Sequence, residues 1–410
     1  MDFEDTAEEA AYRVTVRDWM AANAAEYKTP VNSDGDLIAR AKAWQAKKYA
    51  AGYVGITWPK AVGGQGGTAM QQIIFNQEEG KYWVPSGIYA IGLGMCIPTV
   101  FSHGRPEIMA RYVPVAMQGE HIWCQLFSEP AAGSDLAGIR TKAERDGDGW
   151  IINGQKVWTS GAHRSDYGIV VCRTDPTVPK HKGLTMFIIN MKAPGVEVRP
   201  IKQMAGASEF NEVFFTDVRI ADDHRLGEVG DGWKVSLTTL MHERLAVGGK
   251  PSSSPGVEEM IALARAIDTD EGNALEQSHV RQKIAEVYIQ DRGISLTRMR
   301  TLSALSSGRT PGPESSISKV VVAKMMQDMG SFAGDMSESA GLLTGADAGD
   351  LPHLEALRQT YFWSAGLRIA GGTDEILRNI IAERVLGLPA DIRVDKDVPF
   401  TAVPTGARRG

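Results

Sequence analysis

The stretch CQLFSEPAAGSDLAG at residues 124–138, followed by NGQKVWTSGA at 153–162, is the most informative part of this chain. In the first piece, the small residues from Ala131 to Ser134 leave several backbone N–H groups uncovered, as in loops that hold a phosphate or a polar ring edge. In the second, Trp158 offers a broad aromatic face, and Thr159 and Ser160 offer short hydroxyl groups at a strand end. Each piece alone is equally compatible with a surface turn or an ordinary β-sheet tryptophan. Together they provide what a flat polar ring such as a flavin needs.

Around this stretch the sequence divides into regions that differ in the spacing of their apolar residues. Residues 1–122 have apolar residues at helical spacing, and Thr6 with Glu9 predicts a capping box for the first helix. Residues 123–230 contain short alternating runs separated by Gly, Asp and Pro, which predicts a middle antiparallel β-domain. Helical spacing returns over 231–390, as in a bundle, and 391–410 form a tail that must dock or stay mobile. The predicted fold class is therefore α+β.

Composition indicates an ordinary globular protein. Its 410 residues exceed the usual limit for a single core, so two or three packed subdomains are expected. A net charge of −6 gives no reason to expect nucleic acid or an anionic membrane as a partner. Apolar runs are too short for a transmembrane helix, and the acidic start MDFEDTAEEA is unlike a signal peptide. Three scattered cysteines suit a reducing compartment, so the expected location is the cytoplasm.

The two pieces at 124–162, with GGTDEILRNIIAERVLGLP at 371–389, resemble the acyl-CoA dehydrogenase family. The resemblance extends from about residue 3 to about residue 390. It implies an N-terminal helical domain, a middle β-domain and a C-terminal helical bundle, with FAD as the cofactor. It also implies a role in fatty-acid degradation by β-oxidation. Because the chain lacks a G-x-G-x-x-G fingerprint, loops and subunit contacts would have to hold the dinucleotide.

The resemblance assigns roles to particular residues. It places Gln125 to Ser134 along the flavin, and Trp158, Thr159 and Ser160 at the flavin ring. Thr373 and Glu375 would reach toward the cofactor, although Thr373 is also explained as an ordinary helix N-cap. The cofactor contacts in the loop would come from Gln125, Phe127, Ser128, Gly133 and Ser134, and the substrate contacts from Ser134, Arg244 and Gly372.

The implied chemistry needs a base. Oxidation of an acyl thioester between Cα and Cβ removes the α proton while a hydride leaves Cβ for flavin N5. Many family members place a glutamate directly before the GT of the C-terminal motif, and here that position is Gly371. A minority, including isovaleryl-CoA and long-chain acyl-CoA dehydrogenases, carries the glutamate in a pattern that LMHERLAVGG matches, so the resemblance makes Glu243 the base. Arg244 would contact the CoA, since a guanidinium suits phosphate oxygens. The alternative for both residues is a surface ion pair, which Lys234 could share with Glu243.

Departures from the family pattern bear on assembly. The usual R-x-x-F-G is not visible, and LLTGADAGD at 342–350 replaces the usual Q-x-x-G-G. Such losses resemble bacterial members that act on bulky acyl-CoA esters. The expected assembly is a homotetramer, with an α2β2 heterotetramer containing a related chain as the alternative. The acyl chain itself cannot be read from the sequence.

The expected electron acceptor is an electron-transfer flavoprotein, and a flavin oxidase or monooxygenase is the alternative activity. A non-catalytic partner subunit is a third possibility, against which the presence of Glu243 and the whole SEPAAGSD loop argues. No metal is expected, because the histidines lack metal-binding spacing. An S-x-x-K match at 316–319 is better explained by a Ser-rich helix start, and KMMQDMGSF at 324–332 by core packing.

Overall fold

A computed structural model describes residues 5–28, 33–247, 254–270, 272–306, 312–313, 316–343 and 350–403. The chain forms two compact units. The first contains Met1–Ala246 together with Asp391–Gly410, and the second contains Val247–Ala390. The predicted succession of helical, β-rich and helical regions is confirmed. Within the described residues, no helix has the length and apolar character needed to cross a bilayer.

The helices of the first unit begin where the sequence provides caps. The Thr6 hydroxyl accepts from the Glu9 backbone N–H, and the Glu9 side chain accepts from the Thr6 N–H, so the predicted capping box is confirmed. Thr68 and Gln71 form a second capping box. The helices are α1 (Ala7–Asn23), α2 (Asp34–Ala50), α3 (Ala69–Glu79), α4 (Ile97–His103), α5 (Pro106–Gln118) and α6 (Gly232–Val247).

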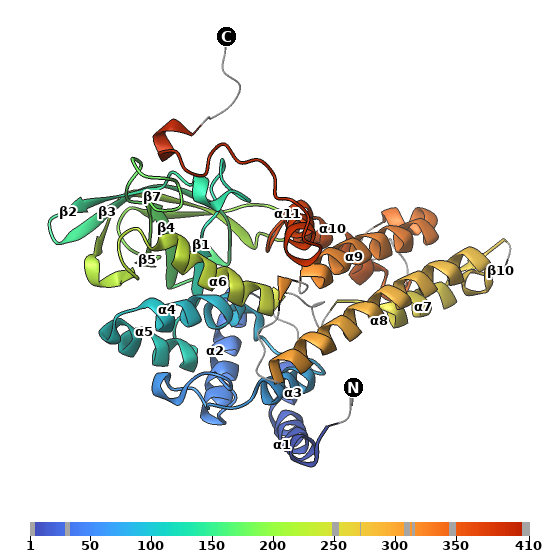
Figure 1. The fold of residues 1–410 in the computed structure, drawn as a ribbon. Coiled ribbons are helices and arrows are strands. Elements are labelled where there is room, and N and C mark those ends of the chain that lie inside the picture. Colours follow the sequence, from blue (N-terminus) through green and yellow to red (C-terminus); the bar gives the residue numbers. More distant parts are fainter. Residues whose placement is uncertain are drawn as a thin grey trace, which may run out of the picture. The chain divides into compact units, whose positions relative to one another are not determined.

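An eight-stranded sheet forms the rest of the first unit (Figure 1). Its hydrogen-bonded order is β6-β7-β3-β2-β4-β5-β8, and β1 pairs with β4. Most neighbours are antiparallel, as predicted, but β1 and β2 each run parallel to β4. The strands are β1 (Trp123–Leu126), β2 (Lys142–Asp146), β3 (Gly149–Ser160), β4 (Tyr167–Arg173), β5 (Leu184–Asn190), β6 (Val196–Pro200), β7 (Phe210–Ala221) and β8 (Arg225–Leu226).

Strand β4 is buried on both faces, which explains its unbroken apolar run. Ile169 and Val171 join the core formed with α4, α5 and α6, which lie against one face of the sheet (Figure 1). Val170 and Cys172 join a second core with residues of β3 and β7. Because side chains alternate along a strand, β4 links both cores and fixes the position of its neighbour β1.

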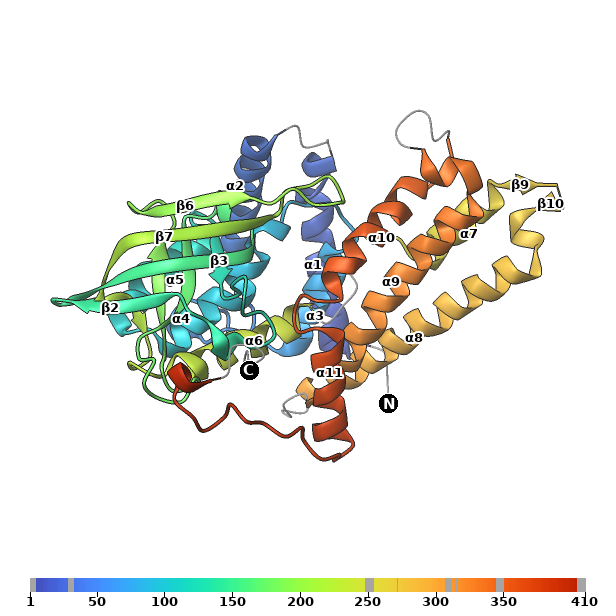
Figure 2. The ribbon, with the colours of Figure 1, turned by 90° about the horizontal axis from the view of Figure 1, so that it is seen from above.

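The second unit is a bundle in which α8, α9 and α10 run side by side (Figure 2). Its core contains Met325, Met326 and Met329, which confirms the core-packing interpretation of the methionine-rich segment. The predicted Ser-rich helix start is also confirmed, because α9 begins at Ser316. The elements are α7 (Val257–Arg265), β9 (Asp268–Thr269), β10 (Gly272–Asn273), α8 (Ser278–Ser306), α9 (Ser316–Met336), α10 (Leu354–Leu367) and α11 (Asp374–Ile380).

Candidate active site

The small-residue loop leaves β1 and is closed by its own backbone. The Glu129 N–H donates to the Ala132 carbonyl at 2.9 Å, and the Ala132 N–H donates back to the Glu129 carbonyl at 3.0 Å. One residue earlier, the Ser128 carbonyl accepts from the Val157 N–H of β3 at 2.9 Å. The tertiary structure therefore fastens the loop directly to the strand that carries Trp158.

A buried ion pair reinforces this connection. The Lys156 ammonium is 0% exposed and donates to Glu129 Oε1 at 2.8 Å and to the Phe127 carbonyl at 3.0 Å. The other donors to the Glu129 carboxylate are the N–H groups of Arg140 and Thr141, at 2.6 and 2.9 Å. Burial opposes ionisation, but Lys156 and these hydrogen bonds lower the pKa of Glu129. With its charges paired and hydrogen-bonded, the base of the loop is rigid.

Trp158 is the most unusual residue of the site. Its φ is +60°, in a region that costs a bulky side chain about 1–2 kcal/mol. The pairing of β3 with β7 shifts register between Lys156 and Thr159, so Trp158 lies in a bulge. Its side chain is 54% exposed and meets Phe210 edge to face at 6.0 Å. The strained backbone thus presents a large apolar ring to the surroundings instead of burying it.

The end of the loop provides open backbone donors. Gly133 and Ser134 are exposed, and a Cβ built on Gly133 would meet no atom within 4 Å. In the described part of the chain, the N–H groups of these two residues have no hydrogen-bond partner. Free N–H groups beside small side chains suit a polar ring edge or a phosphate, so this end of the loop fits the predicted ligand.

The remaining predicted cofactor-binding residues of the first unit differ in how accessible their side chains are to a ligand. Gln125 and Ser160 are half-buried. Phe127 is 5% exposed and belongs to the helix-facing core, so its side chain packs internally. Thr159 is 1% exposed, and its Oγ1 has no hydrogen-bond partner among the described residues. Ser160 is thus the more accessible of the two predicted hydroxyl donors.

The C-terminal motif forms a glycine turn before α11. Gly371 has φ +63° and Gly372 has φ +91°, conformations that favour glycine. Thr373 caps α11 by accepting from the Ile376 N–H at 3.2 Å, which confirms its N-cap role. Glu375 is exposed in the first helical turn. The predicted contacts of Thr373, Glu375 and the two glycines with ligands stay predictions.

A lysine that the sequence analysis did not assign to this turn holds it in place. Lys319 of α9 is 6% exposed and donates to the Gly372 carbonyl at 2.7 Å and to the Arg368 carbonyl at 3.1 Å. Its ammonium also lies 3.4 Å from Asp374 Oδ1, and Arg368 Nε donates to the other Asp374 oxygen at 2.7 Å. The only sequence signal was the charge at the end of the S-x-x-K match, within an apolar helix. Lys156 likewise interrupts a strand pattern, and such a charge signals a buried partner.

Helix α6, which carries the predicted base, is anchored to α4. Thr239 Oγ1 lies 2.9 Å from Thr99 Oγ1, and Thr238 Oγ1 lies 2.8 Å from His103 Nε2. Glu243 and Arg244 belong to the last part of this helix, but their side chains lie outside the described residues. Their catalytic and substrate-binding roles stay predictions.

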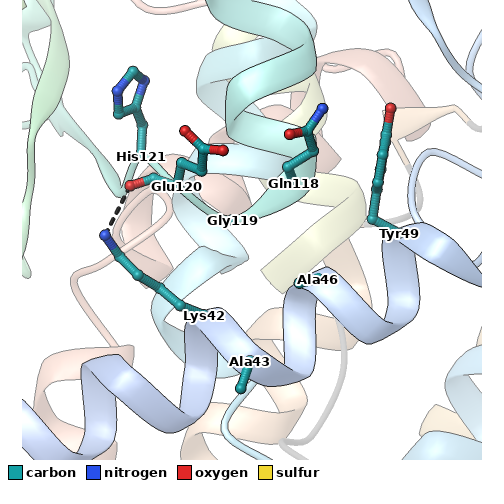
Figure 3. A pocket seen from close by; sticks show the side chains of 8 residues that line it. All are labelled: Lys42, Ala43, Ala46, Tyr49, Gln118, Gly119, Glu120 and His121. Carbon is teal, nitrogen blue, oxygen red and sulfur yellow. Dashed lines mark hydrogen bonds between the residues drawn. The ribbon is translucent and has the colours of Figure 1, made fainter.

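A shallow hollow elsewhere in the first unit lies between α2 and the end of α5 (Figure 3). Lys42 donates to the Glu120 carbonyl across it at 2.9 Å. No predicted site residue lines this hollow. The structure shows no group of three His, Cys, Asp or Glu side chains within its described residues that could hold a metal ion. The hollow is lined by Lys42, Ala43, Ala46, Tyr49, Gln118, Gly119, Glu120 and His121.

Comparison with known proteins places this geometry in context. The chain matches the acyl-CoA dehydrogenase N-terminal domain over residues 6–120, the middle domain over 124–218 and the C-terminal domain over 230–386. It is 34% identical to acyl-CoA dehydrogenase IpdE1 of Mycobacterium tuberculosis, covering 93% of this chain and 98% of IpdE1. It is 37% identical to acyl-CoA dehydrogenase FadE34 of the same organism, covering 81% of this chain but only 44% of FadE34. The solved structure of the Tcur3481-Tcur3483 steroid ACAD matches with a TM-score of 0.79 and 26% identity, covering 95% of this chain and 100% of that one.

Proposed function

Because the chain belongs to the acyl-CoA dehydrogenase family, we propose that it oxidises an acyl-CoA thioester to the trans-2-enoyl-CoA with FAD as its cofactor. When bound, FAD supplies the acceptor for the hydride that leaves Cβ. An electron-transfer flavoprotein is the proposed acceptor of the electrons.

The observation that carries the proposal is Trp158, whose backbone is strained and whose ring is exposed. A bulky residue is kept at φ +60° only where the surrounding structure determines it, and such strain gathers at functional sites. Its 54% exposure leaves a face free for a flat ring, and the half-buried Ser160 lies two residues further along the same strand. The fit to FAD thus rests on this chain's own residues.

In this proposal the loop residues bind and orient the cofactor. The N–H groups of Gly133 and Ser134 donate to polar atoms at the ring edge, and Trp158 packs against the ring. The Glu129–Lys156 pair holds the loop on β3, so the donors and the aromatic face keep one relative geometry. Little reorganisation is then needed on binding.

Glu243 is the proposed base that takes the α proton. The helix that contains it is anchored to α4 through Thr239 and Thr238, about one turn before position 243. A glycine occupies position 371, where many members of the family carry the base, and LMHERLAVGG matches the pattern of members that carry the glutamate at the position of Glu243 instead. Arg244 is proposed to bind phosphate oxygens of CoA.

The proposed substrates are bulky acyl-CoA esters, supported by the similarity to a steroid ACAD. The proposed assembly is a homotetramer. An α2β2 tetramer with a related chain is the alternative, supported by the paired names of that steroid enzyme and by the two missing family motifs. Flavin content decides between them: protein expressed alone carries about one FAD per chain in a homomer, and about one half or none in a heteromer.

The test of the function compares two glutamate variants. Glu243→Gln keeps the side-chain volume and removes the carboxylate, so flavin reduction by the best acyl-CoA should slow about 10²- to 10⁴-fold with FAD still bound. Glu228→Gln is the matched control, because this carboxylate precedes α6 and is 84% exposed, and its variant should reduce flavin at the wild-type rate.

Two outcomes would contradict the proposal in different ways. A wild-type rate of flavin reduction in Glu243→Gln excludes this residue as the base but leaves the flavoenzyme assignment. Protein that is colourless, and that takes up no added FAD even with a co-expressed related chain, excludes the flavoenzyme itself.

A further inference from the structure

The tail at 391–403 belongs to the first unit and lies at its β-sheet (Figure 1, Figure 2). Backbone contacts fix its path: the Phe400 N–H donates to the Val178 carbonyl at 2.9 Å, and the Thr401 N–H donates to the Pro176 carbonyl at 3.2 Å. Pro179 and Pro399 form an isolated antiparallel β-bridge between the segment at 176–179 and the tail. The tail therefore runs against the segment that connects β4 to β5.

Lys180 in that segment joins the tail to the loop. It is 1% exposed, and its ammonium contacts both oxygens of Asp135 at 2.7 and 2.8 Å. Asp395 of the tail also accepts from this ammonium. Asp135 is the residue directly after Ser134, whose N–H is one of the open donors of the loop. A buried ammonium needs charged partners, and Asp135 is 55% exposed, so the tail carboxylate completes the charge pairing.

Arg173, at the end of β4, makes a second connection. It is 4% exposed and donates to the carbonyls of Ala137 and Ile139, at 2.5 and 3.1 Å, and to the Lys180 carbonyl at 3.0 Å. The Phe400 ring of the tail covers this guanidinium, with Cζ 3.6 Å from the ring centroid. Each of the two cations that hold residues 135–139 is thus covered by a tail side chain.

We propose that the docked tail positions the flavin loop, with Asp395 and Phe400 acting as positioning residues through Lys180 and Arg173. The inference rests on the proposed function, because the loop is taken to bind FAD. Removing the tail leaves Lys180 with one half-exposed carboxylate and uncovers Arg173. The turn at 135–139 then fluctuates more, and the N–H groups just before it lose their fixed direction.

The first test measures the loop without FAD, so that it does not depend on the proposed function. Hydrogen exchange of the Gly138 and Ile139 amides, which donate to the Asp135 and Leu136 carbonyls at 2.8 and 3.3 Å, is compared in the flavin-free full chain, in Asp395→Asn and in Phe400→Ala. Exchange should rise about tenfold in Asp395→Asn, the effect of losing roughly one charge-assisted hydrogen bond. Asp397→Asn is the matched control: it removes the same charge two residues away, at an exposed position with no ion pair in the described structure, and should leave exchange unchanged.

The second test measures FAD dissociation. The FAD Kd should rise about three- to tenfold in Asp395→Asn and return toward wild type in Asp395→Glu, which restores the carboxylate. A chain ending after Ala390 should show at least the same loss. If the truncated chain does not fold, the FAD Kd values of Asp395→Asn and Asp395→Glu still test the role of the tail.

The outcomes separate the two proposals. Unchanged exchange at Gly138 and Ile139 in both Asp395→Asn and Phe400→Ala overturns the positioning role, whatever FAD does. A weaker FAD affinity without faster exchange also overturns it, because the tail would then act by another route. Faster exchange in a chain that binds no FAD under any condition supports the positioning role and rejects the proposed function.

Discussion

The clearest energetic prediction concerns Lys156, which holds the loop at 128–134 on β3 through Glu129. Lys156→Met keeps most of the side-chain volume but removes the ammonium. Glu129, only 7% exposed, then keeps its two backbone donors and loses its counter-charge. Breaking a buried pair from one side costs about 3–5 kcal/mol, and the Phe127 carbonyl that loses its donor adds about 1 kcal/mol.

The cost has an upper bound, because Glu129 can take a proton instead of staying charged. Protonation costs about 1.4 kcal/mol for each pH unit above about 4.3, or about 3.7 kcal/mol at pH 7. We therefore expect Lys156→Met to lower the free energy of unfolding of the first unit by about 4 kcal/mol at pH 7. In the variant the folded-state pKa of Glu129 is raised, so the penalty grows as pH rises and shrinks as pH falls toward 5.

Urea denaturation at several pH values measures this penalty. A loss of about 4 kcal/mol moves the midpoint by about 1–2 M for a unit of this size. Lys142→Met is the matched control, since its ammonium also lies 2.8 Å from a carboxylate, that of Glu144, but the two side chains are 53% and 62% exposed. The control should cost less than about 0.5 kcal/mol. Equal losses in the two variants, or a Lys156→Met penalty that does not shrink on acidification, would refute the reasoning.

Three further predictions follow from buried or strained positions. Lys319→Met leaves a buried aspartate with one cation, so thermal unfolding should show the second unit losing about 2–4 kcal/mol. Gly371→Ala places a Cβ at φ +63° and should cost about 1 kcal/mol in urea denaturation; the same strain opposes moving a catalytic carboxylate to this position. Burial by itself would raise the pKa of Asp222, but hydrogen bonds from Trp150 and Arg225 lower it to about 2. The contribution of the Asp222 carboxylate to the free energy of unfolding is therefore fully present above about pH 4 and is lost as pH falls toward 2. In Asp222→Asn the free energy of unfolding should depend less on pH across that range, as measured by acid unfolding.

Local sequence patterns predicted much of the fold correctly. The Thr6–Glu9 capping box, the Thr373 N-cap and the start of α9 at Ser316 each depend on residues a few positions apart, so their signals are visible in the sequence. The apolar run of β4 reflects burial on two faces. The two long motifs at 124–162 and 371–389 indicated the family for the same reason: each is a continuous segment whose residue types reflect local backbone shape.

Only the tertiary structure decided which charged groups support the site. Lys156 meets a carboxylate 27 residues away, Lys319 one 55 residues away, and Lys180 one 215 residues away in the tail. The sequence shows that Lys156 and Lys319 interrupt a strand pattern and an apolar helix, but it gives no such signal at Lys180 and identifies the partner of none of the three. That choice depends on how strands and helices bring distant segments together, because any of the chain's carboxylates could satisfy an ammonium and only packing places one within 3 Å or so and out of water.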